Sequence, residues 1–590
     1  MFKVLKHFDI KERLQVLIII IFAVLQVRLD LMIPGYLRHI TVLAQTPGSQ
    51  TREVAAAGAF MLLCVLGSLA SVIVVSFFAS RTSAALSMRL REKLFTRVGD
   101  FSMLEFSSFS TSSLIARSTN DITQVQQFVM SGLQMLIKIP ILAAGGIIGI
   151  AGTGTAWTMA ALTAFMFVLL VVAIAMVVVI PQFKKMQGLV DRLNLTLRES
   201  LTGRHVVRAF NAEAFHEKRF QEANSGFTKA DRTTNRAMAV MIPTMSLGTN
   251  GATIAVYVIG AFLINAAGSA EALTVFSNMV VMSFYLALLF SAIKFITKVV
   301  PRIPRAVVSA RRITEVLETN PAVCGGDITD GLPGVAGEVS FRDVGFRYPG
   351  AAANTLEGIS FTAKQGETVA IIGSTGSGKS TLINLVMRFF DATEGEVLIN
   401  GVNVKDYELE SLYNKIGYIP QKSVLFKGTI SSNVAYGDNG QGGYSADDAL
   451  WAVRIARAEE FVLKLDEGLS SVVSQRGANL SGGQKQRLSI ARAVCRKPEI
   501  LIFDDSFSAL DYKTDRELRE ALKKETSGTT RLIVAQRIGT IMDADKILVL
   551  DGGKVAGSGT HAELLKSCSV YKEIAMSQLS GEELLGEELL

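Results

Sequence analysis

The strongest constraint on this chain is a set of long segments that contain no charged residue. The longest, residues 139–183, has 45 consecutive uncharged residues. A membrane-spanning helix needs about 20 mostly apolar residues, so this run exceeds any core helix of an ordinary soluble protein. We therefore reject the alternative of a large soluble helical core and expect a membrane domain.

Six membrane spans are predicted. The longest run divides in two at a glycine-rich turn near residues 149–155, because its length suffices for two helices. The first span begins at Leu14 and tolerates Arg28 and Asp30. The other single spans lie in residues 54–80, 237–270 and 272–293.

The basic residues of the loops predict the orientation of the spans. Residues 81–128 carry six Lys or Arg and residues 184–236 carry eleven, whereas the turn near residue 153 and residues 265–270 carry none. By the positive-inside rule, both termini and the two basic loops face the cytoplasm of the cell. The basic residues that set the orientation account for much of the net charge of +7. This charge therefore does not indicate nucleic-acid binding.

Composition divides the chain into four parts. We expect a transmembrane domain in residues 1–300 with two long cytoplasmic coupling loops, a Pro- and Gly-containing linker in 301–335, a second domain in 336–578, and an acidic tail in 579–590. The tail repeats "GEELL" twice, as either a native or an added segment. Cysteine spacing supports neither a disulfide framework nor a zinc site; the four cysteines are Cys64, Cys324, Cys495 and Cys568.

The sequence pattern of the second domain is typical of an α/β protein. Short apolar segments such as "TVAIIG", "ILIFDD", "RLIVAQ" and "KILVLDGG" alternate with helical stretches such as "TLINLVMRFF". This alternation predicts a mainly parallel sheet flanked by helices. The expected fold class is therefore an α-helical six-span transmembrane domain fused to an α/β domain.

A phosphate-binding loop follows the first of these strands. "GSTGSGKST" fits G-x-x-x-x-G-K-[ST] between a strand and a helix. Its backbone N–H groups would surround phosphate oxygens at the helix N-terminus, Lys379 would reach the outer phosphates, and the Ser380 hydroxyl would bind Mg²⁺. The predicted nucleotide-binding residues of this P-loop are Gly373, Ser374, Thr375, Gly376, Ser377, Gly378, Lys379, Ser380 and Thr381.

Two further motifs make the prediction specific. "LSGGQKQR" occupies residues 480–487, and the strand "ILIFDD" brings Asp504 to its end. Together with the P-loop and the six spans, they resemble the ATP-binding cassette family, specifically exporters with six spans fused to one cassette. The resemblance covers nearly the whole chain, because "SLIARSTNDITQVQ" and "RESLTGRHVVRAFNAE" resemble the intracellular loops of those exporters.

The resemblance implies roles for residues outside the P-loop. Tyr348 would stack on adenine, Gln421 would sense Mg²⁺ and the membrane domain, and Asp511 of "SALD" would lie in the loop that crosses to the opposite cassette. In this family two cassettes enclose two ATP molecules, so one six-span chain is half a transporter. The implied Mg²⁺ ligands are Ser380, Gln421 and Asp504, and the residues that complete the partner's ATP site are Ser481, Gly482, Gly483 and Gln484.

Two catalytic positions depart from the family pattern. Asp505 stands where the family has the glutamate that activates water, and Gln536 stands where it has a histidine at the γ-phosphate. The aspartate carboxylate is shorter by one C–C bond, about 1.5 Å, and a displacement of about 1 Å can cost on the order of 10²-fold in rate. A glutamine amide can donate a hydrogen bond but cannot carry positive charge.

These departures favour one half of a heterodimeric exporter of the multidrug or lipid type, with a degenerate site of its own and a hydrolytic site on the partner. The expected substrate is small and hydrophobic or amphipathic, moved by alternating access out of the cytoplasm or inner leaflet. A homodimer with slow sites, a same-fold importer of the siderophore type and a non-transporting regulatory subunit are the alternatives.

Some residues remain without an assigned role. Arg28, Asp30 and Lys138 are ionisable residues within spans, and such groups usually face a cavity or a partner. Their partners are expected on other helices, and structural pairing and substrate contact are equally open. Gln475 and Asn400 stand where the family usually has glutamate and aspartate, and they either tune coupling or have no role.

Overall fold

A computed structural model describes residues 8–46, 50–151, 155–266, 269–299, 302–438 and 443–579. The chain forms two compact units. We call Met1–Gly99 with Ser110–Thr319 the helical unit, and Asp100–Phe109 with Asn320–Leu590 the sheet unit. The acidic repeat of the predicted tail lies outside the described residues.

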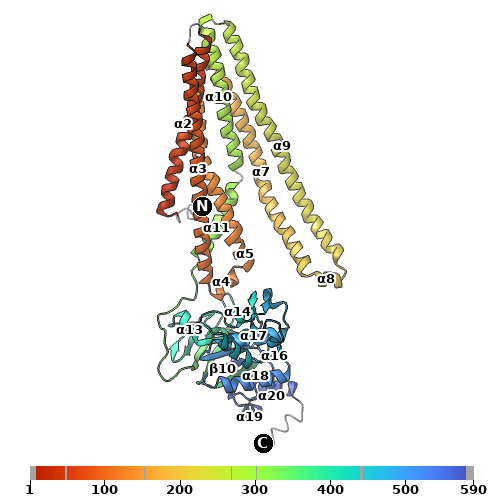
Figure 1. The fold of residues 1–590 in the computed structure, drawn as a ribbon. Coiled ribbons are helices and arrows are strands. Elements are labelled where there is room, and N and C mark those ends of the chain that lie inside the picture. The colour runs from red at the N-terminus through yellow and green to blue at the C-terminus, as the bar shows by residue number, and fades with distance from the viewer. Residues whose placement is uncertain are drawn as a thin grey trace. The chain divides into compact units, whose positions relative to one another are not determined.

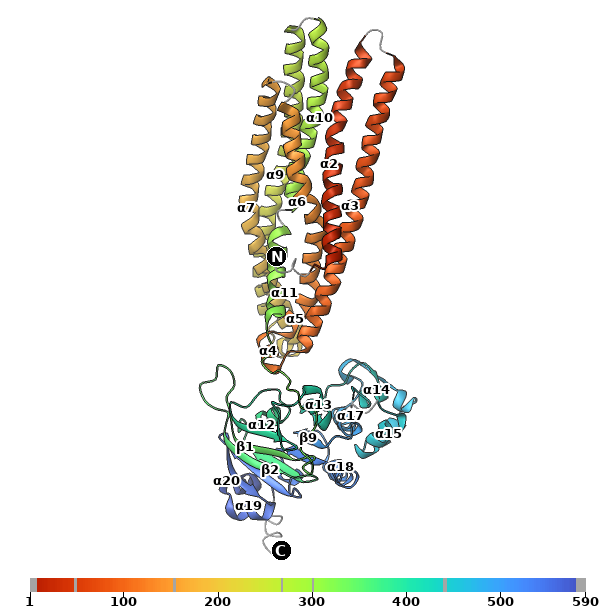
Figure 2. The same ribbon diagram turned by 90° about the vertical axis from the view of Figure 1, so that its left-hand side faces the viewer.

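Among the described residues, six helices of the helical unit are long and apolar enough to cross a membrane, which confirms the predicted number of spans. Figure 2 shows α2 and α3 as a neighbouring pair, and α7 and α9 pack along each other in the same unit. The six are α2 (Ile10–Gln45), α3 (Thr51–Gly99), α6 (Ile122–Ala151), α7 (Thr155–Thr202), α9 (Glu213–Ala266) and α10 (Ser269–Val299).

Glycines allow some of these helices to approach closely. A Cβ at Gly145 of α6 would lie 2.2 Å from Leu31 Cδ1 of α2, and one at Gly248 of α9 would lie 2.2 Å from Val168 Cγ2 of α7. Membrane helices pack through such small residues because lipid supplies no hydrophobic drive between them. Large apolar side chains such as Phe262 remain exposed, as lipid-facing residues do.

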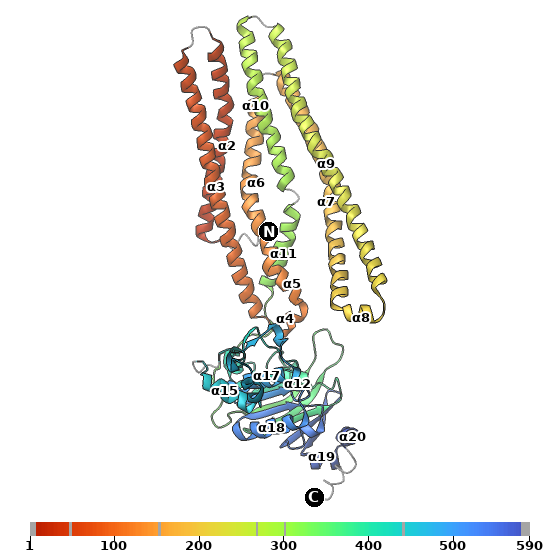
Figure 3. The ribbon, with the colours of Figure 1, turned by 45° about the vertical axis from the view of Figure 1, so that its right-hand side comes forward.

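Short helices interrupt the long helices in the two predicted coupling loops. After α3 the chain forms α4 (Met103–Ser108), α5 (Thr111–Ala116) and a π-helical turn, η1 (Arg117–Asp121). The second break is α8 (Arg204–Ala209), which joins the ends of α7 and α9 (Figure 1; Figure 3). Long helices therefore continue on both sides of each break.

The predicted linker 301–335 contains a helix that its prolines did not suggest. Helix α11 (Arg302–Glu318) packs against α6, η1 and α3 within the helical unit. Pro304 is compatible with it because it lies in the first turn, where a backbone N–H has no partner within the helix. In the described part of the linker, the irregular residues are those after Glu318. The division at 301, 336 and 579 stays a prediction.

The sheet unit contains the predicted parallel sheet. Its strand order is β12-β11-β3-β10-β9-β6, in which all neighbours are parallel except β11 and β12. These strands are β3 (Thr368–Gly373), β6 (Ile416–Ile419), β9 (Ile500–Asp504), β10 (Thr530–Val534), β11 (Lys546–Asp551) and β12 (Lys554–Gly559). A second, antiparallel sheet has the order β2-β1-β4-β5, from β1 (Val339–Phe346), β2 (Leu356–Ala363), β4 (Glu394–Ile399) and β5 (Val402–Asn403).

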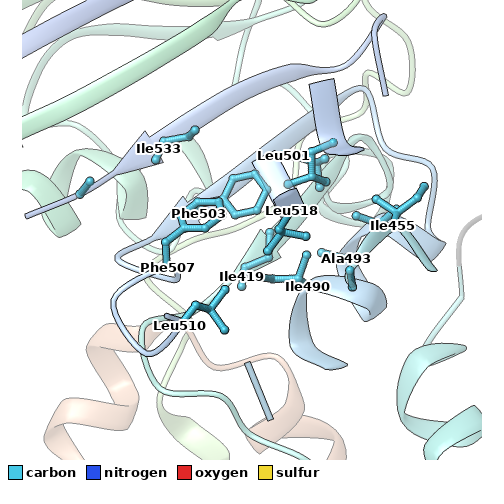
Figure 4. Close-up of a cluster of buried hydrophobic side chains, with 14 of the residues drawn as sticks. Ile419, Ile455, Ile490, Ala493, Leu501, Phe503, Phe507, Leu510, Leu518 and Ile533 are labelled. Atoms are coloured by element: carbon cyan, nitrogen blue, oxygen red, sulfur yellow. The ribbon is translucent and has the colours of Figure 1, made fainter. Parts of the chain in front are cut away.

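Helices cover the parallel sheet. Phe503 of β9, Ile533 of β10 and Leu518 of α18 share one buried cluster with Phe507 (Figure 4). The helices used below are α12 (Lys379–Val386), α17 (Gly482–Cys495), α18 (Tyr512–Glu525) and α20 (Ser569–Gln578). The others are α13 (Leu409–Lys415), α14 (Ile430–Val434), α15 (Ala446–Ile455), α16 (Glu459–Leu463) and α19 (His561–Ser567).

Candidate functional site

The candidate site lies at one edge of the parallel sheet. Strands β6, β9, β10 and β3 are successive neighbours, so their carboxyl ends meet there. Gln421 follows β6, Asp504 ends β9, Gln536 follows β10 and the P-loop follows β3. Ligands of open parallel sheets bind at this edge. The strand order thus brings together residues that are far apart in the sequence.

The P-loop has a backbone that only glycine adopts easily. Gly376 and Gly378 have φ of +86° and +100°. A Cβ at Gly378 would lie 2.5 Å from Leu356 Cδ2, and one at Gly373 would lie 2.1 Å from the Leu550 carbonyl oxygen, whereas Gly376 has open space. The backbone therefore closes tightly at the ends of the loop and stays accessible in its middle, as a phosphate cradle requires.

Lys379 is held against this loop. Its Nζ donates to the carbonyl oxygens of Gly373 at 2.8 Å and Ser374 at 2.7 Å. Burial lowers the pKa of Lys379, and the nearby carboxylates of Asp505 and Asp504 partly oppose this shift. A cation that loses water in this way favours an anionic ligand, so the residues present fit a phosphate group.

Asp504 forms a compact oxygen-rich cluster at the end of β9. Ser380 Oγ donates to Asp504 Oδ1 at 3.3 Å, and Asp504 as a residue is 8% exposed. Burial raises the pKa of Asp504 and raises that of Tyr418, its hydrogen-bond partner, to about 12. Hydroxyl and carboxylate oxygens suit Mg²⁺, so the donor set fits that ion. Sequence reasoning missed Tyr418, which β6 places beside β9.

Asp505 is the centre of an amide–carboxylate contact. Its Oδ2 accepts hydrogen bonds from Gln536 Nε2 at 2.9 Å and from Gln421 Nε2 at 3.2 Å. Its backbone N–H donates to the Val534 carbonyl, and its φ is +50°. The two residues that depart from the family pattern are therefore in direct contact, and both amides hold the same carboxylate oxygen.

A residue of the C-terminal helix supports this arrangement. Gln578 of α20 donates from Nε2 to the Gln536 carbonyl at 2.8 Å and accepts at Oε1 from the Ile538 N–H at 2.8 Å. The backbone on both sides of Arg537 is thereby fixed. No local motif marks Gln578, so sequence reasoning did not identify it.

The LSGGQ segment forms the start of α17. Ser481 is the N-cap, its hydroxyl accepts from the Gln484 N–H at 3.3 Å, and Gln484 Oε1 accepts from the Ser481 N–H at 2.8 Å. A Cβ at Gly482 would meet nothing within 4 Å, and Gly483 has only ordinary contacts. An accessible helix N-terminus of this kind attracts anions.

The remaining predicted site residues lie near these elements. Asp511 is the N-cap of α18 and accepts from the Thr514 N–H at 3.0 Å. This backbone hydrogen bond lowers the pKa of Asp511. Tyr348 is half-buried, and its hydroxyl lies 3.1 Å from Thr381 Oγ1 of the P-loop, which keeps its ring beside the site.

Two of the ionisable residues within the spans are partners across helices. Ser68 of α3 donates to Asp30 Oδ1 at 2.6 Å, and Lys138 Nζ of α6 lies 3.9 Å from Asp30 Oδ2 and 5.7 Å from the ring centre of Phe295. The prediction of partners on other helices is confirmed for Asp30 and Lys138. Arg28 is exposed.

The two smaller departures differ in their surroundings. Asn400 is buried with φ of +51°. Its Oδ1 accepts from the Gly337 N–H at 2.7 Å and its Nδ2 donates to Glu499 Oε2 at 2.5 Å. Asn400 is thus a structural residue of the sheet unit. Gln475 is exposed, and nothing in the structure explains it.

Comparisons with known proteins agree with this geometry. The family model described as "ABC transporter" matches residues 356–508, and the one described as "ABC transporter transmembrane region" matches residues 16–293. An "uncharacterized ABC transporter ATP-binding protein" of Mycobacterium tuberculosis (strain H37Rv) is 38% identical over 540 residues, which is 90% of each chain.

A more distant relative and a solved structure indicate the type of transporter. An "ATP-dependent lipid A-core flippase" of Pseudomonas fluorescens is 32% identical over 499 residues, or 85% of this chain and 81% of that one. The solved structure of a bacterial Atm1-family ABC exporter with ATP bound is 27% identical, with a TM-score of 0.75 over 96% of this chain and 99% of that one. These similarities do not favour the importer alternative. The chain therefore belongs to the ABC exporter family, as a multi-pass half-transporter with a cytoplasmic ATP-binding domain and ATPase-coupled transport.

Proposed function

We propose that this chain is one half of a heterodimeric exporter. Its own P-loop site holds ATP with Mg²⁺ but hydrolyses it slowly, and its LSGGQ segment completes a faster site on the partner chain. The observation that carries the proposal is the contact of Gln536 and Gln421 with one oxygen of Asp505.

Three features of Asp505 and its neighbour Gln536 slow hydrolysis at this site. Its carboxylate is about 1.5 Å shorter in reach than that of a glutamate. Two amide donors fix its orientation and occupy lone pairs that a base uses to accept a proton from water. Its neighbour Gln536 is neutral, so it cannot supply the positive charge of a histidine to a developing negative charge.

The groups that hold ATP support retention at the same site. Lys379, Ser380 and Asp504 have the charge and oxygen chemistry that a triphosphate with Mg²⁺ needs, and Tyr348 contacts Thr381 at the rim of the loop. These residues bind and orient the nucleotide, and hydrolysis of ATP supplies the free energy for transport. Binding and hydrolysis are therefore separated within one site.

The need for a partner follows from the exposed LSGGQ segment. No hydrogen bond joins Ser481–Gln484 to Gly373–Thr381 in the described part of the chain, and Ser481 and Gly482 are exposed. The backbone N–H groups at the start of α17 can bind an anion, and no phosphate held by the chain's own P-loop would reach them without such a contact. A phosphate held by a second cassette is the ligand that we propose for it.

The tip of the α7–α9 hairpin gives a second reason for a partner. Helix α8 buries none of its residues, and the flanking Leu201 and Phe210 are 71% and 77% exposed, with Val206 of α8 at 61%. Apolar side chains gathered at a cytoplasmic tip indicate a surface that another protein covers. We propose that the partner half-transporter covers it.

The substrate that we propose is amphipathic, in line with the flippase activity named for one relative. A cavity of about 150 Å³ among α2, α3, α6 and α10 is lined by Gln26, Gln134 and Lys138, together with apolar residues that include Phe295. Polar groups within membrane spans cost free energy unless they pair with one another or bind a ligand. A polar head group with an apolar body would satisfy both kinds of lining.

We further propose that both termini lie in the cytoplasm, because the positive-inside rule puts the two basic loops there. A cysteine introduced at Lys3 should be labelled by a membrane-impermeant maleimide only after cells are opened. The matched control is a cysteine in the turn near residue 153, which should be labelled in intact cells. The reverse pattern would overturn the orientation.

The experiment that tests the proposed function compares this chain alone with its assembly. The chain purified alone should bind ATP but show little steady-state ATPase activity. Co-expression with a six-span cassette chain that carries glutamate and histidine at these positions should restore turnover. Robust turnover of the chain alone, abolished by Lys379→Ala, would support the homodimer alternative and contradict the heterodimer.

A further inference from the structure

The helical unit contains a cavity of about 150 Å³. Helix α2 packs against α3, α6 and α10 (Figure 2), and the cavity lies among these four helices. Its lining includes the buried residues Ala23, Gln26 and Val75, whereas Val72 and Ser76 of α3 are exposed. The other lining residues are half-buried, so a ligand can pass Val72 and Ser76 to reach the buried floor.

Gln26 is a buried amide without a partner. The residue is 6% exposed, and its side chain forms no hydrogen bond to any other residue that the structure describes. Gln134 of α6 lines the same cavity and likewise has no hydrogen bond within the described part of the chain. A buried polar group is unfavourable until it is hydrogen-bonded. Two amides on different helices are therefore available to a ligand in the cavity.

Lys138 is the charged residue of the lining. Its Nζ lies 3.9 Å from Asp30 Oδ2, beyond the length of about 2.7–2.9 Å of a charge-assisted hydrogen bond. Asp30 does not line the cavity, and its other oxygen accepts from Ser68 at 2.6 Å. Among the described residues, the carboxylate therefore stabilises the ammonium group through its charge without occupying the N–H donors of Nζ.

The lining favours an anion that has several oxygens. Its four polar side chains, which are the two amides, Lys138 and Ser76, can all donate hydrogen bonds and lie on three different helices, and its described residues include no carboxylate. A phosphate group accepts hydrogen bonds from several directions at once, and its charge is opposite to that of Lys138. The chemistry of the cavity thus fits a phosphate.

The depth of the cavity indicates where such a phosphate comes from. Ser76 precedes Arg81, the first charged residue after the uncharged run 54–80, by five residues, or about 7.5 Å along the helix. The positive-inside rule puts Arg81 at the cytoplasmic end of the span, and the head groups of inner-leaflet lipids lie near that boundary. Val72 lies one turn farther toward the middle of the span, in the direction that acyl chains extend.

We propose that this cavity binds the phosphate of an inner-leaflet lipid, and that a lipid with a terminal phosphate is preferred to one with a zwitterionic head group. The phosphate would lie beside Lys138, Gln26 and Gln134, and the acyl chains would leave past Val72. A choline group would bring a second positive charge close to Lys138, which is unfavourable. This inference names the polar part of the amphipathic substrate proposed above and rests on that proposal.

The size of the cavity agrees with a head group as its ligand. Its volume of about 150 Å³ is below the range of about 300–1,000 Å³ that drug-sized ligands occupy. The cavity therefore holds the phosphate and leaves the acyl chains outside, against exposed apolar residues such as Val72.

The test is native mass spectrometry of the full chain, titrated separately with dioleoyl phosphatidic acid and dioleoyl phosphatidylcholine, which have the same acyl chains. The first phosphatidic acid should bind at least about tenfold more tightly, the discrimination typical of one hydrogen bond to a charged group. Lys138→Gln should remove this preference, and Lys138→Arg should retain it. Lys229→Gln, at an exposed lysine on α9, is the control for loss of positive charge and should leave both affinities within about twofold.

Gln26→Leu provides a second variant, because Lys138→Gln also leaves Asp30 without its cation. A leucine suits the apolar bundle, so this variant should fold, and it should bind phosphatidic acid about fivefold more weakly through the loss of one hydrogen bond. An unchanged affinity of Gln26→Leu for phosphatidic acid, or a preference that survives Lys138→Gln, would overturn the site.

The two lipids also separate this inference from the proposals on which it rests. Equal binding of phosphatidic acid and phosphatidylcholine would keep an amphipathic ligand but overturn the preference for a terminal phosphate. No saturable binding of either lipid would overturn the amphipathic ligand of this cavity as well. The chain is measured alone, so none of these outcomes depends on the heterodimer proposal.

Discussion

The P-loop, which we expect to hold phosphate, and the end of β9 with Asp505, which we expect to activate water, lie at the same edge of one sheet, yet they are built differently. The P-loop keeps strained glycines, a lysine and a serine in the pattern that ATP binding requires. The water-activating region has Asp505, which is held by two glutamine amides. On the proposed roles, binding and hydrolysis depend on separable residues, so one can weaken while the other stays intact.

The two departures also form one structural element. Gln536 donates directly to Asp505, and Gln578 fixes the backbone of Gln536 from α20. A change in either residue therefore alters the surroundings of the other. This coupling supports the proposal that the P-loop site of this chain hydrolyses ATP slowly.

The largest effect is expected from Ser481→Arg in the assembled transporter. A bulky side chain at the exposed N-cap of α17 would meet the phosphate held by the partner and prevent closure. Steady-state ATPase activity should fall at least about 10²-fold, as for the loss of a group that acts on the transferred phosphate. Ser567→Arg, an exposed serine on α19, should leave activity within twofold, about the scatter of surface substitutions.

A gain of activity is expected next, from Asp505→Glu combined with Gln536→His. The longer carboxylate recovers about 1.5 Å of reach, and the histidine can carry charge. In an assembly whose partner chain has its catalytic glutamate replaced by glutamine, so that the partner's site is silent, the residual ATPase rate should rise by about 10- to 10²-fold. An unchanged rate would show that these two residues do not limit the site.

Lys379→Ala should weaken retention of ATP by this chain by about tenfold or more, since a charge-assisted hydrogen bond contributes about 1.5–3 kcal/mol. Binding of a fluorescent ATP analogue to the purified chain measures it, with exposed Lys405→Ala as the control. The assembled transporter should keep part of its ATPase activity. If the ATPase activity of the assembled transporter fell to background, this site would have to be catalytic.

A smaller effect on stability is expected from Asn400→Asp, which restores the residue usual in the family. Asn400 Nδ2 donates to Glu499 Oε2 at 2.5 Å, so an aspartate would place two carboxylates in contact. The free energy of unfolding of the sheet unit should fall by about 1–3 kcal/mol at pH 7. Asn400→Asp with Glu499→Gln should recover it, and thermal unfolding of both variants checks the prediction.

Much of the fold was predictable because its signals are local. Uncharged runs identify the spans, and the P-loop motif needs only its own strand and helix. Contacts between distant residues were not predictable. Gln421 and Gln536 meet Asp505 because β6, β9 and β10 are neighbours, and strand order cannot be read from the separate motifs. The contacts of Tyr418 and Gln578 with the site could not be predicted for the same reason.

Helix α11 shows a different limit of sequence reasoning. Pro304 indicated a linker, but proline is tolerated in the first turn of a helix. The outcome depends on packing of α11 against α6 and α3, which composition does not reveal.

We propose that the P-loop site of this chain binds ATP without setting the rate of turnover. The most direct test measures steady-state ATPase of the purified assembly with Asp505→Asn and, separately, with Ser481→Arg. Our account predicts a change of less than about tenfold for Asp505→Asn, under about 1.4 kcal/mol of activation free energy, and near-complete loss for Ser481→Arg. A silent Asp505→Asn assembly beside an active Ser481→Arg assembly would contradict it.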